Sequence, residues 1–291
     1  MAFIRKNLGG WLVMLPSLIL LAFFVWVPLL SNVSLSFFEV KGYTKVEFVG
    51  LAKYREVFSD PQFQQAFVNT GQYVVWSLLI GFGLPLFLAL LLSEVVHLQG
   101  FFRTALYFPN MVPGLAGAML WKFLLDPDPG GVFNAILARL NAPPQPWLNS
   151  QVWVIPLIVL TMTWKGAGAT TLIYLAAIQS VSRTYYEAAR MEGASVWQRI
   201  RYITLPSIAP TIRLLFVLQI ISVFQVFYEP LVMTGGGPNN ASLSLLQLIY
   251  RYAFVRGDAA KAAALGVIVA ATLLVLTGFY LQLSKKAEEH E

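Results

Sequence analysis

The sequence predicts an all-α integral membrane protein, a bundle with six transmembrane helices, and two observations support this fold class. The first is composition: 57% of the 291 residues are hydrophobic and 12% are charged, whereas soluble domains are about 45 to 50% apolar and about 25% charged. The second is the position of the charges. Stretches without Asp, Glu, Lys or Arg recur along the chain, near or above the roughly 20 residues that a helix needs to cross a bilayer. These stretches are 7–38, 61–93, 104–121, 140–164, 230–250 and 262–284.

The six spans are expected at about residues 11–31, 70–92, 105–125, 152–180, 208–233 and 261–283 of a single domain, 1–291. The first span is too long for the apolar core of a signal peptide, and it lacks a small-residue cleavage pattern, so we expect it to be retained. Arg5 and Lys6 precede it, and Lys285 and Lys286 follow the last span. Because basic residues concentrate on the cytoplasmic side of membrane helices, both termini are predicted to be cytoplasmic.

Composition also excludes several chemistries. The chain has no cysteine, so disulfides, thiolate nucleophiles, iron–sulfur clusters and zinc–thiolate sites are ruled out. The two histidines, His97 and His290, are too far apart in the sequence to suggest a metal site. The net charge of +6 is scattered over the membrane edges, which fits anionic lipid better than nucleic acid. The spans hold no convergent carboxylate, His or Ser–His constellation, so we predict neither catalytic residues nor metal ligands.

The segments between the spans carry weaker signals. Apolar residues recur at helical spacing between Leu51 and Phe58, which predicts a short amphipathic helix outside the membrane. The stretch 126–147 is rich in Pro and Gly and predicts an external loop with one helical turn at 134–139. Lys122, near the end of the third span, is expected to extend outward from it.

The segment 181–206 holds four arginines and two glutamates and cannot cross a membrane, although its sequence is helical. Gly193 is expected to end a first helix in a left-handed conformation. Two capping boxes are predicted, Thr184 with Glu187 and Ser195 with Gln198. We therefore expect a helix, an elbow and a second helix, closed by Pro206.

This segment carries a long motif: Glu187-Ala188-Ala189, three residues, Gly193, nine residues, and Ile203-Thr204-Leu205-Pro206. It closely resembles the signature cytoplasmic loop of the permease subunits of ATP-binding-cassette importers, which reads E-A-A, three residues, G, nine residues, I-x-L-P. In that family the loop is the coupling helix that docks on the ATPase subunit. The resemblance implies that the coupling residues are Glu187, Ala188, Ala189, Gly193, Ala194, Leu205 and Pro206.

Further stretches narrow the resemblance to the binding-protein-dependent sugar permeases of maltose-permease type. They are 48–54, Asn69-Thr70, 101–103 with Pro109, Trp121, 233–238 and 252–254. The Gly-Gly-Gly-Pro sequence in 233–238 is similar to that of the first of the two unequal permeases in such importers. Lys53 stands where Asn is expected, and Glu192 stands where Asp is commoner.

The resemblance implies a multi-subunit importer in a bacterial or archaeal cytoplasmic membrane. Its other parts would be a second homologous permease, two ATPase subunits and an extracytoplasmic solute-binding protein. The chain has no G-x-x-x-x-G-K-[ST] sequence, so phosphate cannot be held in P-loop fashion. We expect this chain to bind no cofactor, with ATP and Mg used by the partner subunits. The substrate stays open among di- and oligosaccharides, polyols and glycerol phosphate.

Lys165 is the most informative single residue, because a Lys at the centre of a membrane helix costs about 2.5 to 3.5 kcal/mol on insertion scales. It either faces a polar cavity or extends to an interface if the span begins later than predicted. By the resemblance, six residues line the sugar pathway: Asn110, Gly114, Lys165, Gly166, Gln219 and Ser222. Ala169 and Val223 align with further pathway positions but are apolar, so the polar contacts would be distributed differently from those of the maltose permease.

A second class of function is also open. A stand-alone, ion-coupled secondary transporter would use Lys165 and Glu229 as an ion-coupling pair. Glu229 lies beside Pro230 near the end of the fifth span. That position fits an interfacial group better than a proton relay.

Overall fold

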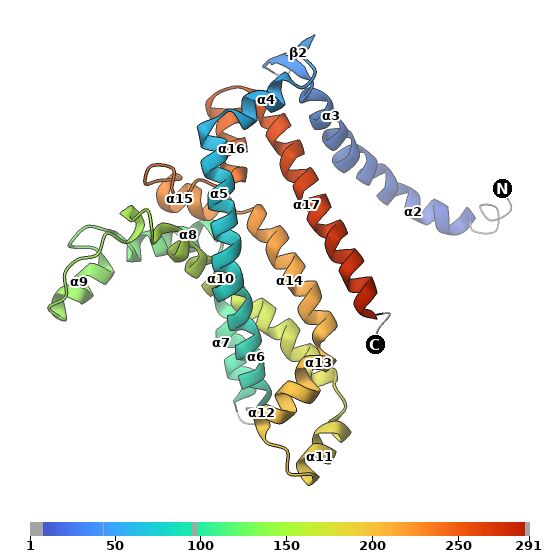
Figure 1. Cartoon of the computed structure of the whole chain (residues 1–291), viewed down its shortest axis with the longest axis vertical. Helices are drawn as coiled ribbons and strands as arrows, with labels where there is room; N and C mark the ends of the chain where they lie inside the picture. The colour runs from blue at the N-terminus through green and yellow to red at the C-terminus, as the bar shows by residue number, and fades with distance from the viewer. Residues whose placement is uncertain (1–7, 43, 95–97, 289–291) are drawn as a thin grey trace. The chain divides into compact units, whose positions relative to one another are not determined.

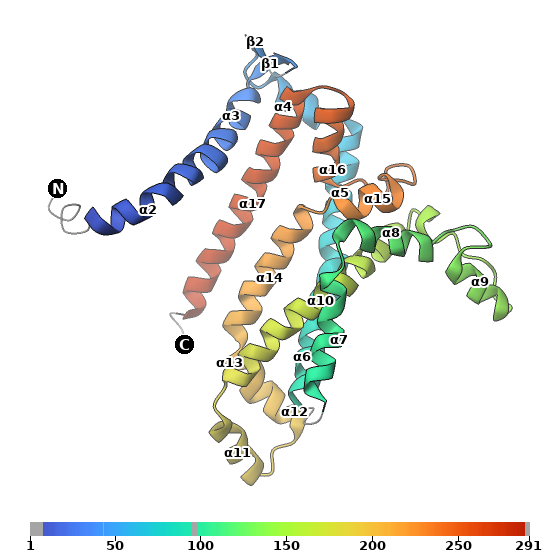
Figure 2. The ribbon, with the colours of Figure 1, turned by 180° about the vertical axis from the view of Figure 1, so that it is seen from behind.

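The computed structural model describes residues 8–42, 44–94 and 98–288. The chain divides into two compact units, and each is described by itself (Figures 1 and 2). The first unit is Met1–Pro61 with Ile249–Thr272, and the second is Gln62–Leu248 with Leu273–Glu291. Four predicted features lie outside the described residues, namely Arg5, Lys6, His97 and His290, and so do the side chains of Lys285 and Lys286.

The described residues are mostly helical, as predicted. The first unit holds α2 (Leu8–Leu21), η1 (Ala22–Trp26), α3 (Val27–Leu35), β1 (Phe38–Lys41), β2 (Thr44–Phe48), α4 (Ala52–Phe58) and η5 (Arg251–Val255). The second holds η2 (Ser77–Phe82), α6 (Gly83–Glu94), α7 (Gln99–Met111), α8 (Gly114–Leu124), α9 (Val132–Arg139), η3 (Trp147–Asn149), α10 (Val154–Ser180), α11 (Arg183–Met191), α12 (Val196–Arg199), η4 (Ile200–Thr204), α13 (Leu205–Ser207), α14 (Ala209–Phe224) and α15 (Tyr228–Thr234). Three helices contribute to both units: α5 (Pro61–Trp76), α16 (Leu245–Tyr250) and α17 (Ala259–Glu288).

The chain's first helical rod runs without a break through α2, the π-helical η1 and α3. The rest of the chain buries none of its apolar window, Gly10–Leu35. A surface this apolar needs an apolar surrounding that the chain does not supply, which fits a helix facing lipid or another chain.

A β-hairpin follows this rod and was not predicted. Strands β1 and β2 pair antiparallel, with Phe38 opposite Phe48 and Lys41 opposite Thr44. Gly42 has a φ of +66°, a conformation that glycine adopts without steric cost. Helix α4 comes next and confirms the helix predicted from the apolar spacing.

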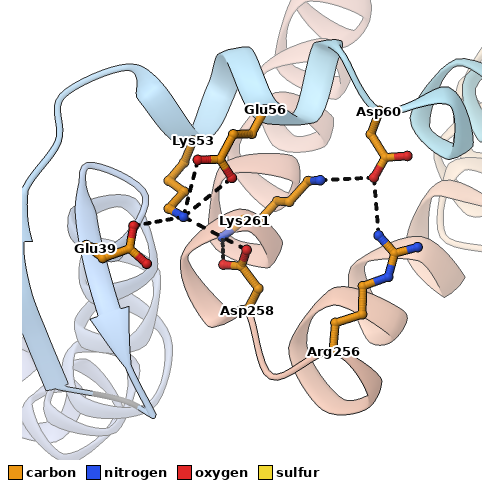
Figure 3. A network of polar contacts seen from close by, with 7 residues as sticks. All are labelled: Glu39, Lys53, Glu56, Asp60, Arg256, Asp258 and Lys261. Atoms are coloured by element: carbon orange, nitrogen blue, oxygen red, sulfur yellow. Dashed lines mark hydrogen bonds and ion pairs between the residues drawn. The ribbon is translucent and has the colours of Figure 1, made fainter.

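Lys53 of α4 is buried and lies at the centre of an acidic cluster (Figure 3). Its Nζ lies 2.9 Å from a carboxylate oxygen of Glu39, 3.4 Å from Glu56 and 3.9 Å from Asp258. Burial by itself lowers the pKa of Lys53, but the hydrogen bond that its ammonium donates to Glu39 and the charges of Asp258, Glu56 and Glu39 outweigh it, so the pKa is raised. The lysine that stands at position 53 in place of the expected Asn thus has three carboxylates to balance its charge.

A second group of contacts surrounds Asp60 in the same unit (Figure 3). Its carboxylate accepts hydrogen bonds from the Tyr252 hydroxyl at 2.7 Å, from Arg256 at 3.2 Å and from Lys261 at 2.9 Å. Burial and the hydrogen bond to Asp60 raise the pKa of the Tyr252 hydroxyl. Asp258 accepts from the backbone N–H of Lys261 at 2.9 Å and so caps the start of α17. These contacts tie α4 to the segment that begins α17.

In the second unit, α10 packs along α6, α7 and η2 (Figure 1). Gly168 permits the closest approach, because a Cβ there would clash with the carbonyl oxygen of Leu106 and would lie 3.0 Å from the Cα of Tyr107. Tyr174 and Leu175, further along α10, are buried in an apolar cluster with α6. A residue without a side chain therefore sets the distance between α7 and α10.

A glycine-rich loop after α15 is held by side chains of α5. Asn69 Nδ2 donates to the carbonyl oxygens of Asn240 at 2.7 Å and of Leu243 at 2.9 Å, and the Tyr73 hydroxyl donates to that of Ser242 at 3.0 Å. Asn69 is buried, so these bonds satisfy polar groups that water cannot reach.

The helices over the predicted third and fifth spans are interrupted. Val112 and Pro113 are extended between α7 and α8, and residues 225–227 separate α14 from α15. In the described part of the chain, three helices are long and apolar enough to cross a membrane: Gly10–Leu35, Pro61–Glu94 and Ala259–Gln282. A fourth is added if Val196–Ser207 and Ala209–Phe224, bent by 69°, count as one span. The six-span arrangement therefore stays a prediction.

Gly168→Ala should destabilise the second unit by about 1–3 kcal/mol, because the added Cβ forces α7 and α10 apart. Thermal unfolding of the purified protein in detergent measures this loss. Gly166→Ala is the matched control on the same helix, since nothing lies within 4 Å of a Cβ at that position. Equal melting temperatures for the two variants would contradict the close packing at Gly168.

Lys53→Met should destabilise the first unit by about 1–3 kcal/mol, because it leaves three carboxylates without their shared cation. The raised pKa also gives a pH dependence. The contribution of Lys53 is complete below its ordinary pKa of 10.5 and is lost as the pH rises beyond the folded-state value. Thermal unfolding of both proteins from pH 7 upward should show a constant difference that shrinks in strong alkali. A difference that grows with pH would contradict this account.

Candidate functional site

The first helix of the 181–206 segment begins earlier than the capping prediction required. Ser182 is the N-cap residue of α11, and its side chain makes no capping bond with the backbone. The predicted capping box of Thr184 with Glu187 is therefore wrong. Thr184 lies inside the first turn, where its hydroxyl lies 3.0 Å from that of Ser182, and the position three residues after Ser182 is Tyr185, which has no carboxylate to close a box.

The elbow at Gly193 is confirmed. Its φ is +77°, and two hydrogen bonds close the end of α11: Gly193 N–H donates to the carbonyl of Arg190 at 3.0 Å, and Ala194 N–H donates to that of Ala189 at 2.9 Å. This pair of bonds is a Schellman motif, which needs a left-handed residue at Gly193.

The second predicted capping box is also confirmed. Gln198 N–H donates to the Ser195 hydroxyl at 3.3 Å, and Ser195 N–H donates to the Gln198 side chain at 2.7 Å. The box starts α12, which continues through η4 into α13. The chain then bends by 69° into α14, just after Pro206.

One contact within the 181–206 segment and one contact with α6 hold the elbow in place, and the surface of the elbow is open. The Tyr186 hydroxyl lies 3.0 Å from that of Thr204, and Arg199 lies 4.0 Å from Glu94 of α6. The predicted coupling residues are exposed or half-buried: Glu187, Ala188, Gly193 and Pro206 are exposed, and Ala189, Ala194 and Leu205 are half-buried. The predicted coupling residues thus present small side chains and the carboxylate of Glu187 to their surroundings.

Two of the predicted pathway residues meet directly. Lys165 of α10 is half-buried, and its Nζ lies 3.1 Å from the point that a Cβ on Gly114 would occupy. Gly114 begins α8, directly after the break at Val112 and Pro113. The lysine therefore occupies space that a larger residue at position 114 would take.

Gln219 lies in a different group. Its Nε2 donates to the hydroxyl of Ser77, and both atoms surround Gly81, together with the Thr163 hydroxyl. A Cβ on Gly81 would lie 3.1 Å from Gln219 and from Thr163. Thr163 and Lys165 are two residues apart on α10 and project about 200° apart, so the structure places Lys165 and Gln219 beside different faces of that helix.

The remaining predicted residues make fewer contacts. Asn110 and Gly166 are half-buried, and Ser222 is exposed, with its hydroxyl donating to the backbone carbonyl of Gln219 at 2.8 Å. The aligned positions Ala169 and Val223 are half-buried and buried, respectively. Nothing in these contacts tests a role in a pathway.

Sequence reasoning missed Ser77, Gly81 and Thr163. Ser77 and Gly81 lie in η2, a π-helical segment of an otherwise α-helical span. Such segments often mark functional sites. A signal was available in the sequence, because a Ser four residues before a Gly inside an apolar span places a hydroxyl and a gap on one helix face.

A polar pocket lies at the other end of α8. Its volume is about 220 Å³, and its lining comes from α8, η3, the end of α15 and the loop that follows α15. The lining residues are Lys122, Leu148, Asn149, Met233, Thr234, Gly237 and Pro238. Lys122, which was expected to extend outward from the third span, lines this pocket.

Among the described residues, Lys165 and Glu229 form no ion pair. Glu229 belongs to α15 and lies near Tyr73, on whose hydroxyl its charge acts. The pair required by an ion-coupled transporter is therefore not formed in this conformation.

Long apolar helices, two interrupted helices and a polar elbow between helices are together typical of helical membrane transport proteins. Residues 81–289 match the family described as binding-protein-dependent transport system inner membrane component, and the chain belongs to this family.

Individual relatives match over nearly the whole length. The chain is 30% identical to the trehalose/maltose transport system permease protein MalF of Thermococcus litoralis, over 97% of this chain and 95% of that protein. It is 29% identical to the arabinooligosaccharides transport system permease protein AraP of Bacillus subtilis, over 97% and 90%. Its fold matches a chain of the bacterial alginate ABC transporter in complex with alginate pentasaccharide-bound periplasmic protein, with a TM-score of 0.87, 29% identity and coverage of 98% and 97%.

Proposed function

We propose that this chain is the transmembrane permease subunit of an ATP-binding-cassette importer that translocates a saccharide delivered by an extracytoplasmic binding protein. The family match carries this proposal. The relatives include permeases named for arabinooligosaccharides and for trehalose and maltose. The importer would hold this chain, a second homologous permease and two ATPase subunits in a bacterial or archaeal cytoplasmic membrane.

The elbow is proposed as the point where the ATPase acts. Its two helices are fixed by the Schellman motif at Gly193 and the capping box at Ser195, so the unit can move as one body. The small residues Ala188 and Ala189 allow a partner surface to approach closely, and Glu187 offers a carboxylate to a basic or donor group. ATP and Mg would be bound by the partner subunits.

The interrupted helices are proposed to line the pathway. Backbone outside helices is tolerated at membrane depth where it is buried in protein or lines a polar cavity, and broken helices form the substrate sites of many transporters. The break at 112–113 lies between the predicted pathway residues Asn110 and Gly114. The break at 225–227 comes shortly after two others, Gln219 and Ser222. This arrangement supports six spans, with both termini and the elbow in the cytoplasm and the 126–147 loop outside.

The decisive experiment compares the chain alone with the whole complex in proteoliposomes. We expect uptake of at least one of three labelled saccharides, maltotriose, arabinotriose or trigalacturonate, and only when the second permease, the ATPases, the binding protein and ATP are present. Uptake by the chain alone, driven by an ion gradient and indifferent to ATP, would instead establish the secondary transporter.

Glu187→Lys and Gly193→Trp should each lower sugar uptake by about tenfold or more, because coupling energies between sites are worth about 5- to 150-fold. Both proteins should still reach the membrane and associate with the second permease. Glu192→Lys is the matched control, since Glu192 is also exposed and is one of the three residues that the motif leaves unspecified between Ala189 and Gly193. Normal uptake by both variants would refute the assignment of the elbow to coupling.

A further inference from the structure

Lys165 is a charge placed deep in a helix. It lies eleven residues after Val154 and fifteen before Ser180 in α10, about 16 Å and about 22 Å along the helix axis. Both distances exceed what a lysine side chain can span, so the ammonium does not reach either end of the helix.

No acidic side chain in the described ranges lies within ion-pair distance of Lys165, and its Nζ makes no hydrogen bond there. The contrast with Lys53 is clear, since that buried lysine has three carboxylates around it. A cation held in a poorly hydrated place needs a counter-charge. At Lys165, which is half-buried, the described residues supply none, and its Nζ lies in the space that Gly114 leaves beside the α7–α8 break.

A second lysine, Lys122, lies on α8 and is exposed. It follows Gly114 by eight residues, about 12 Å along the helix, and lines the pocket of about 220 Å³ with Asn149 and Thr234. It too has no ion pair within the described part of the chain. The ammonium of Lys165, from α10, thus lies beside the first residue of α8, and that of Lys122 lies near its last turn. Two neighbouring ammonium groups without carboxylate partners attract anions.

We infer that the saccharide carried along this route is acidic and bears a carboxylate, sulfonate or phosphate group. The anionic group binds first beside Lys122 in the pocket, with Asn149 and Thr234 as hydrogen-bonding neighbours, and then pairs with Lys165 at the α7–α8 break. A neutral sugar would leave both ammonium groups uncompensated. This inference rests on the proposed function, because it requires that the chain translocates a saccharide at all.

The test uses the complete importer with its binding protein in proteoliposomes that contain ATP, and matched probes that differ in charge. The pairs are maltotriose with trigalacturonate, glucosylglycerol with sulfoquinovosyl glycerol, and glycerol with glycerol 3-phosphate. We expect the charged member of at least one pair to enter and its neutral counterpart to be excluded. Entry of a neutral member with exclusion of the charged one would overturn the inference and leave the proposed function intact. Failure of all six probes to enter would overturn both.

Substitutions then assign the charge preference to its residues. Lys165→Gln should lower uptake of the charged probe by about tenfold or more, and Lys122→Gln by about threefold or more, whereas Lys165→Arg retains the charge and most of the uptake. The matched control is Lys41→Gln, which removes an exposed lysine of β1. Co-purification with the second permease checks that each variant assembles. Undiminished uptake of the charged probe by both glutamine variants would overturn the assignment.

Discussion

Hydrocarbon offers no hydrogen-bond partner, so a polar group inside the membrane must find one within the protein. The second unit meets this constraint locally where it can. Thr161 and Thr171 donate their hydroxyls to the carbonyls four residues earlier in α10, at 3.1 Å and 2.7 Å. Where a side chain is too long to be satisfied in this way, the partner comes from another helix, and such contacts fix which helices pack together.

One polar contact and one steric contact determine the packing around α10. Gln219 of α14 reaches Ser77 of η2 across the space that Gly81 leaves open. Gly168 lets α7 approach so closely that a single methyl group would collide with its backbone. The first unit uses charge instead. Lys53 and Asp60 each bind several oppositely charged or hydroxyl-bearing neighbours.

The sequence predicted features whose cause is local. Gly193 and the Ser195 box follow from residues within a few positions of each other, and both are confirmed. The predicted box at Thr184 is wrong because two hydroxyl-bearing residues, Ser182 and Thr184, could each start the helix. The prediction chose Thr184 because Glu187 follows it by three residues, but the helix begins after Ser182. Local pattern also missed the hairpin, whose strands are only four and five residues long.

Features that depend on distant residues were beyond sequence reasoning. The resemblance placed Gln219 and Lys165 together in one pathway, but nothing in the sequence of either helix shows that the Gln219 side chain donates to Ser77 beside Gly81. The role of Lys53 also needed the fold, because Asp258 follows it by more than two hundred residues. Pro113 was a sequence signal for the break after Met111. Only the structure shows that Lys165 fills the space beside Gly114, the residue that follows this break.

In the proposed importer, a run of helix interrupted only by the 69° bend joins the elbow to the predicted pathway residue Gln219, and this connection explains why the elbow would have to be rigid. From Ser195 the chain runs through α12, η4 and α13 to the 69° bend and then along α14 to Gln219. The bond between Tyr186 and Thr204 fastens α11 to the same stem. A displacement of α11 therefore moves the stem rather than deforming the elbow, and it reaches η2 through the bond between Gln219 and Ser77. A loose elbow would absorb that displacement before it reached the spans.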